Sequence, residues 1–131
     1  MAILVTGHGN FATGIMSAIE VIIGESPATM AVDLGSEAPH EFERRLDEAI
    51  MQANRSAGVL VCADLPGATP FTCAARMTRE HSDIRVIAGA NLPMLLEVLT
   101  QRGAQSPEEL AQLAQTAGRQ GIVQWESTTA P

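Results

Sequence analysis

The chain has 131 residues, of which 46% are hydrophobic and 18% charged, and its formal net charge is −7. This length fits one domain, and the composition is that of a globular α/β protein rather than a disordered or fibrous one. All eight basic residues are arginines that form no basic run, so nucleic acid is not expected as a partner.

No apolar stretch reaches the roughly 18–20 residues of a membrane span, and no basic flank precedes the apolar start. We therefore expect a soluble, cytoplasmic protein. A single domain is predicted over residues 1–131, with an ordered core at 1–125 and a polar tail at 126–131. Cys62 and Cys73 have a spacing that matches no metal or redox motif, so both are predicted as core residues, and no metal or cofactor is expected.

Apolar runs of strand length alternate with segments of helical period, which predicts an open parallel sheet flanked by helices. The elements predicted in chain order are strand Ile3–Thr6, helix Phe11–Ile23, strand Thr29–Leu34, helix Pro39–Ala53, strand Val59–Ala63, a helix that begins at Thr69-Pro70, strand Ile84–Ala88, a helix from Asn91-Leu92-Pro93 through Arg102, a helix from the capping box Ser106–Glu109 to about Gly118, and a short final strand Ile122–Trp125. Helix Phe11–Ile23 places Ile15, Ile19 and Ile22 on one face. Thr69 is predicted as the N-cap of its helix, with Pro70 in the first turn.

The ends of two predicted strands carry residues that can take part in a reaction. His8 follows the first strand and Asp64 follows the third, and the carboxyl ends of neighbouring parallel strands are where ligands bind. A carboxylate on one ring nitrogen fixes the imidazole tautomer and leaves the other nitrogen free to attack phosphorus. A histidine in a glycine-flanked turn can equally be structural, so position alone leaves both hypotheses open.

Small residues and helix starts surround the same place. Gly7 and Gly9 leave room for a tetrahedral group near the backbone, and His8 lies just before a helix whose amides favour an anion. The turn Gly67-Ala68-Thr69, before another helix start, offers further N–H donors and a hydroxyl. We predict a phosphate-binding cradle made by Gly9 and this turn.

Three segments, Ile3–Gly9, Asp64–Phe71 and Val86–Leu95, resemble the signature segments of mannose-class IIA components of the bacterial phosphoenolpyruvate-dependent sugar phosphotransferase system, and the resemblance spans nearly the whole chain. It implies a phosphotransferase component in which His8 accepts phosphate from HPr on Nε2 and passes it to a IIB protein. It also implies that Asp64 orients the histidine and that Thr69 helps to hold the phosphoryl group.

The resemblance further implies a homodimer in which an antiparallel edge strand, here Ile122–Trp125, is exchanged between subunits. We expect the acceptor to be a separate IIB chain, with the membrane IIC and IID components involved only indirectly. The family often has glycine where this chain has Ala68, and some members have tryptophan where it has Pro66.

The same residues leave other functions open. The phosphotransfer subunit of dihydroxyacetone kinase shares the fold and the histidine and differs mainly in its acceptor. A His-Gly-type tetrapyrrole metal chelatase needs a second inward histidine, whereas His40 and His81 are predicted on the surface. Gly7-x-Gly9 with Asp33 is a weak dinucleotide signature. A receiver domain needs a lysine that the chain lacks, and Cys73 with Arg79 has the spacing, but not the glycines, of a thiol phosphatase.

Overall fold

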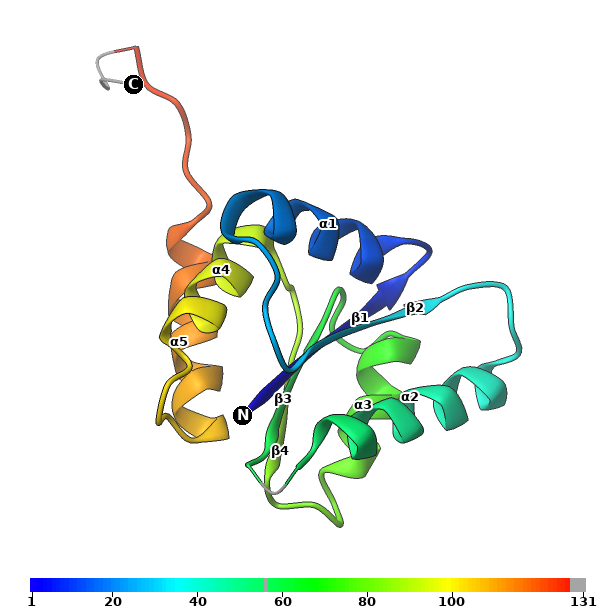
Figure 1. Cartoon of the computed structure of the whole chain (residues 1–131). Helices are drawn as coiled ribbons and strands as arrows, with labels where there is room; N and C mark the ends of the chain where they lie inside the picture. Colours follow the sequence, from blue (N-terminus) through cyan, green and yellow to red (C-terminus); the bar gives the residue numbers. More distant parts are fainter. Residues whose placement is uncertain (56, 128–131) are drawn as a thin grey trace.

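The computed structural model describes residues 1–55 and 57–127. Four parallel strands form one open sheet in the order β2-β1-β3-β4 (Figure 1). The strands are β1 (Ala2–His8), β2 (Thr29–Leu34), β3 (Val59–Ala63) and β4 (Ile84–Ile87). The predicted fold class, a parallel four-stranded sheet flanked by helices, is confirmed.

Helices cover both faces of this sheet. One face carries α1 (Phe11–Ile23), α4 (Leu92–Gln101) and α5 (Pro107–Gln120), and the other carries α2 (Pro39–Ala53) and α3 (Thr69–Met77) (Figure 1). The predicted capping box of α5 is present: the Ser106 hydroxyl accepts from the Glu109 amide while the Glu109 carboxylate accepts from the Ser106 amide. Helix α5 continues two residues beyond the predicted end at Gly118.

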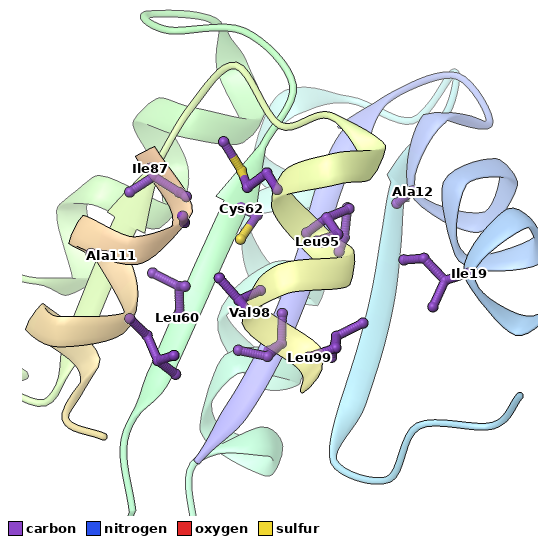
Figure 2. Packing of buried hydrophobic residues seen from close by; sticks show 14 residues of the cluster. Ala12, Ile19, Leu60, Cys62, Ile87, Leu95, Val98, Leu99 and Ala111 are labelled. Carbon is purple, nitrogen blue, oxygen red and sulfur yellow. The ribbon is translucent and has the colours of Figure 1, made fainter. Parts of the chain in front are cut away.

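Alternation along the strands divides the core into two halves. In β1, Ile3 and Val5 face the α1–α4–α5 layer, whereas Ala2 and Leu4 face α2 and α3. Figure 2 shows the first half, where Cys62 lies among aliphatic side chains of the sheet and α4. Both cysteines are buried, as predicted, and burial raises the pKa of the Cys62 thiol to about 12. Strand β1 is therefore held from both faces up to the residue before His8.

The start of α3 differs from the prediction. Ala68, not Thr69, is the N-cap, because its carbonyl accepts the first helical hydrogen bond from the Thr72 amide at 2.9 Å. Thr69 is the first helical residue. Gly67 makes the turn into the helix with φ +77°, while Ala68 has an ordinary φ of −85° that any residue adopts.

The C-terminal segment does not extend this chain's sheet. Ile122–Trp125, predicted as a fifth strand, has no regular secondary structure, and Ile122, Val123 and Trp125 are exposed. In Figure 1 the segment after α5 runs away from the domain. A strand that pairs only in a second subunit would be absent from a single chain, so its exchange stays a prediction. Of the predicted polar tail, residues 128–131 lie outside the described residues.

Candidate functional site

His8 and Asp64 form a closely bonded pair at one edge of the sheet. Strands β1 and β3 are parallel neighbours with Thr6 opposite Ala63, so the residues that follow lie side by side. Asp64 Oδ2 lies 2.7 Å from His8 Nδ1 and also accepts the His8 backbone amide at 2.9 Å. The Asp64 carboxylate thus binds both the ring and the main chain of His8.

The surroundings keep Asp64 charged. Partial burial alone would raise the pKa of this carboxyl, but hydrogen bonds from the His8 amide, the His8 ring and the Leu65 amide together lower it below its usual value. The Asp64 side chain is 12% exposed, whereas that of His8 is 47% exposed. An ionised acceptor at Nδ1 makes that nitrogen the protonated one in the neutral ring. Nε2 then carries the free lone pair.

The absence of a side chain at Gly7 allows Asp64 to approach His8. A Cβ atom at residue 7 would lie 2.6 Å from Phe11 Cδ2 and 2.9 Å from Asp64 Cγ, both inside van der Waals contact. The Phe11 ring and the Asp64 carboxylate occupy the space where a side chain would stand. The sequence predicts that Gly7 makes room for a tetrahedral group, but in the structure this space is taken by Phe11 and Asp64.

On the α1 side of His8, the amides of Gly9 and Thr13 are already committed, whereas within residues 1–55 and 57–127 the structure describes no acceptor for the amides of Asn10, Phe11 and Ala12. The Gly9 amide donates to the Leu34 carbonyl at 2.8 Å, and the Thr13 amide donates to Asp33 Oδ1 at 3.1 Å. Gly9 has φ +57°, so its glycine is needed to turn the chain out of β1. The predicted use of the Gly9 amide for phosphate would require breaking an existing bond.

On the α3 side, the donors are free. The structure describes no acceptor, within residues 1–55 and 57–127, for the amides of Gly67, Ala68, Thr69 and Phe71. These amides open α3, whose N-terminus carries a partial positive charge that favours anions. The Thr69 hydroxyl lies at the same helix start. The arrangement can bind an anion beside the imidazole without first losing a protein hydrogen bond.

The segment Gly89–Asn91 supports the site from the next strand. The Gly89 amide donates to the Asp64 carbonyl at 3.1 Å, and Ala90 donates to the Ala63 carbonyl at 3.0 Å. Asn91 caps α4 by accepting the Met94 amide and donates to the Gly118 carbonyl of α5. This part of the third signature segment fixes the main chain at Asp64.

Asp33 is the site-adjacent residue whose place sequence reasoning missed. The sequence places it only in a weak dinucleotide signature, yet it contacts the first turn of α1 through Thr13. An acid at the carboxyl end of a strand beside the histidine strand was the available signal.

The other candidate groups lie elsewhere. His40 is exposed at the start of α2, and His81 is half-buried at the turn before β4. Within residues 1–55 and 57–127, no group of three or more His, Cys, Asp or Glu side chains is placed to hold a metal ion. None of the helices in the described ranges is both long and apolar enough to cross a membrane.

Comparisons with known proteins point to one family. The family model described as PTS system fructose IIA component matches residues 2–115. The sorbose-specific EIIA component of Lacticaseibacillus casei is 32% identical over 113 residues, which cover 84% of this chain and 80% of that protein. The crystal structure of an EIIA component from Streptococcus agalactiae superposes with a TM-score of 0.86 at 28% identity, covering 94% of this chain and 95% of the other.

A longer relative shows the same segment within a larger protein. The mannose-specific EIIAB component of Escherichia coli K12 is 31% identical over 124 residues, which are 93% of this chain. The match covers only 38% of that relative's length. The chain is thus similar to one part of that protein and to most of the L. casei protein.

Proposed function

The chain belongs to the family of PTS system fructose IIA components, and from this membership we propose that it carries a phosphoryl group on Nε2 of His8. The observation that carries the proposal is the Asp64 contact: with Nδ1 held at 2.7 Å from a carboxylate, Nε2 is the free nitrogen on a ring that is 47% exposed. A phosphorylated donor protein can reach such a nitrogen.

The proposed reaction is a transfer between two phosphorylated proteins. The Nε2 lone pair attacks the phosphorus of phospho-HPr, the bond between phosphorus and HPr breaks, and a phosphohistidine forms on His8. Positive charge that develops on the imidazole is stabilised by the Asp64 carboxylate. In the second step, a nucleophile of a IIB protein attacks the same phosphorus, and the electrons of the N–P bond return to Nε2.

The oxygens of the transferred group would bind at the start of α3. The free amides of Gly67, Ala68 and Thr69 and the Thr69 hydroxyl are the donors that support this assignment. A helix end stabilises an anion by about 0.3–1 kcal/mol at an exposed site, so the cradle would hold the group without trapping it. We assign Gly9 the role of turning the chain rather than of a phosphate donor.

Partners follow from the same proposal. HPr would be the donor, a IIB protein the acceptor, and the IIC and IID membrane components would be reached only through IIB, which places the chain's action in the cytoplasm. The exposed Ile122, Val123 and Trp125 support a homodimer in which the C-terminal segment pairs with a second subunit.

The test is to incubate the protein with phosphoenolpyruvate, enzyme I and HPr and to look for acid-labile, base-stable phosphate. We expect label on the wild type and on the matched control His40→Gln, and none on His8→Gln. Adding a IIB protein should remove the label. An unlabelled wild type, or full labelling of His8→Gln, would refute the proposal. If the phosphate were transferred to the nucleotide subunit of dihydroxyacetone kinase and not to IIB, the chain would be the phosphotransfer subunit of that kinase.

A further inference from the structure

Asp33 lies on the opposite side of the histidine strand from Asp64. Strand β2 pairs with β1 so that Asp33 is opposite Gly7 and Leu34 is opposite His8. Neighbouring strands are separated by about 4.8 Å, so Asp33 belongs to the immediate surroundings of the histidine turn. The strand that ends in His8 therefore has an aspartate on each side, Asp33 on β2 and Asp64 after β3, and Asp64 is the one that contacts the His8 ring.

The second carboxylate is bound to the start of α1. Asp33 Oδ2 accepts the Thr13 hydroxyl at 2.6 Å, and Oδ1 accepts the Thr13 amide at 3.1 Å. Asn10, which occupies the N-cap position of α1, makes no side-chain capping bond. Asp33 thus supplies from another strand the cap that Asn10 does not provide.

This arrangement places a fixed negative charge at the N-terminus of α1, which would otherwise stabilise a phosphoryl group electrostatically. The Asp33 carboxylate lies at the positive end of α1 and accepts one of its amides, so its negative charge lowers the attraction of this helix end for a second anion. Arg45 does not neutralise this carboxylate in the described residues: its Nη2 donates to the Asp33 main-chain carbonyl and to Glu37 Oε1. Within residues 1–55 and 57–127, Thr13 is the hydrogen-bond partner that the structure describes for the Asp33 carboxylate, at the helix start that follows the histidine turn.

We propose that Asp33 is a positioning residue that fixes the first turn of α1 and, through its charge, makes phospho-His8 less stable and easier to discharge. The inference rests on the proposed function of His8. It assigns the two helix starts different roles: the α3 amides bind the phosphoryl oxygens, and the capped α1 limits how tightly the group is held. A carrier between two proteins benefits from such a limit, since the group must leave again.

The test separates charge from capping with two variants. Asp33→Asn removes the charge and leaves one acceptor oxygen for the two Thr13 donors, whereas Thr13→Val keeps the charge and removes the hydroxyl bond. Each protein is phosphorylated chemically with phosphoramidate, which needs no protein donor, and the half-life of phospho-His8 is measured. The partition of phosphate between HPr and the protein is then measured at equilibrium.

For Asp33→Asn we expect a partition shifted about two- to fivefold toward phospho-His8, and a longer half-life. The shift should shrink at high salt, because salt screens charges near the surface. Thr13→Val should melt at a lower temperature while keeping the wild-type partition. A wild-type partition and half-life in Asp33→Asn, or an equal shift in Thr13→Val, would overturn the inference. Failure of the wild type to accept phosphate from HPr would instead refute the proposed function, while the chemical route would still measure the effect of Asp33.

Discussion

Replacing Asp64 by asparagine should separate the orienting role of this residue from its place in the fold. The carboxylate serves three donors: Oδ2 accepts the His8 amide and Nδ1, and Oδ1 accepts the Leu65 amide at 2.8 Å. Asparagine has a single acceptor oxygen. Whichever way its amide is turned, its NH₂ group meets a backbone N–H that was previously bonded.

The cost in stability can be worked from these contacts. A hydrogen bond to a charged group contributes about 1.5–3 kcal/mol, and a buried unpaired donor costs about 1–3 kcal/mol. Because water reaches part of this site, we expect Asp64→Asn to lower the free energy of unfolding by about 1–2 kcal/mol at neutral pH. The protein should still fold, since both core clusters are untouched.

The pH dependence has a defined sign. The pKa of Asp64 is lower in the folded protein than its usual value. Its contribution to stability is therefore complete above the ordinary carboxyl pKa of about 3.9 and is lost as the pH falls through the folded-state value. Urea unfolding of wild type and variant should differ at pH 7 and converge in acid.

The kinetic effect should be larger than the effect on stability. With NH₂ facing the ring, Nδ1 becomes the acceptor and Nε2 carries the proton, so the attacking lone pair is lost; with the oxygen facing the ring, the tautomer is kept but the negative charge that stabilises the imidazolium is gone. We expect single-turnover transfer from phospho-HPr to slow about 10²–10⁴-fold, with the changed tautomer visible in ¹⁵N NMR of His8. Asp47→Asn is a suitable control, because Asp47 Oδ1 is buried without a partner in the described residues and belongs to α2. Transfer within threefold of wild type in Asp64→Asn would refute the orienting role.

Three further predictions concern the fold. Gly58→Ala should lower the free energy of unfolding by about 2–4 kcal/mol, because φ at residue 58 is +88° and a Cβ would lie 2.7 Å from the Pro107 ring. Gly14→Ala should raise the free energy of unfolding by about 0.5–1 kcal/mol, because a Cβ there meets nothing within 4 Å. Equal effects of the two substitutions in urea titrations would contradict this reasoning. Cys62 should resist iodoacetamide at pH 8 until the protein unfolds, since its pKa is about 12, and rapid native-state alkylation would argue against it. Ser106→Ala should cost about 1 kcal/mol through loss of the capping box, measured by thermal melting, and an unchanged Tm would count against the cap.

The sequence predicted the fold and the main contact of the site for a clear physical reason. Alternating apolar periods determine strand and helix boundaries locally, and parallel pairing then brings the carboxyl ends carrying His8 and Asp64 together. The bounds of α1, α2, β2 and β3 agree with the predicted ones. Which helix face is covered is harder to predict, since Ile22 shares an apolar face with the buried Ile19 yet is exposed.

What the sequence did not predict depends on contacts between distant residues. Nothing local indicates that Asp33 caps a helix twenty positions earlier, or that the Gly9 amide is taken by Leu34. The function of Gly7 also depends on Phe11 and Asp64 meeting at one point. The final segment Ile122–Trp125 has a strand-like composition but no partner strand within the described chain, and pairing decides whether such a segment becomes a strand.

The contrast between committed and free amides at His8 should be directly visible in amide hydrogen exchange. The amides of His8, Gly9 and Thr13 have acceptors and should exchange slowly, whereas those of Gly67, Ala68 and Thr69 should exchange nearly as fast as in an open chain. A phosphoryl group bound at α3 would slow the second set, whereas one bound at α1 would slow the amides of Asn10, Phe11 and Ala12, which also have no acceptor in the described residues. One resonance-by-resonance comparison would then report, without any mutation, on which side of the imidazole the transferred group is held.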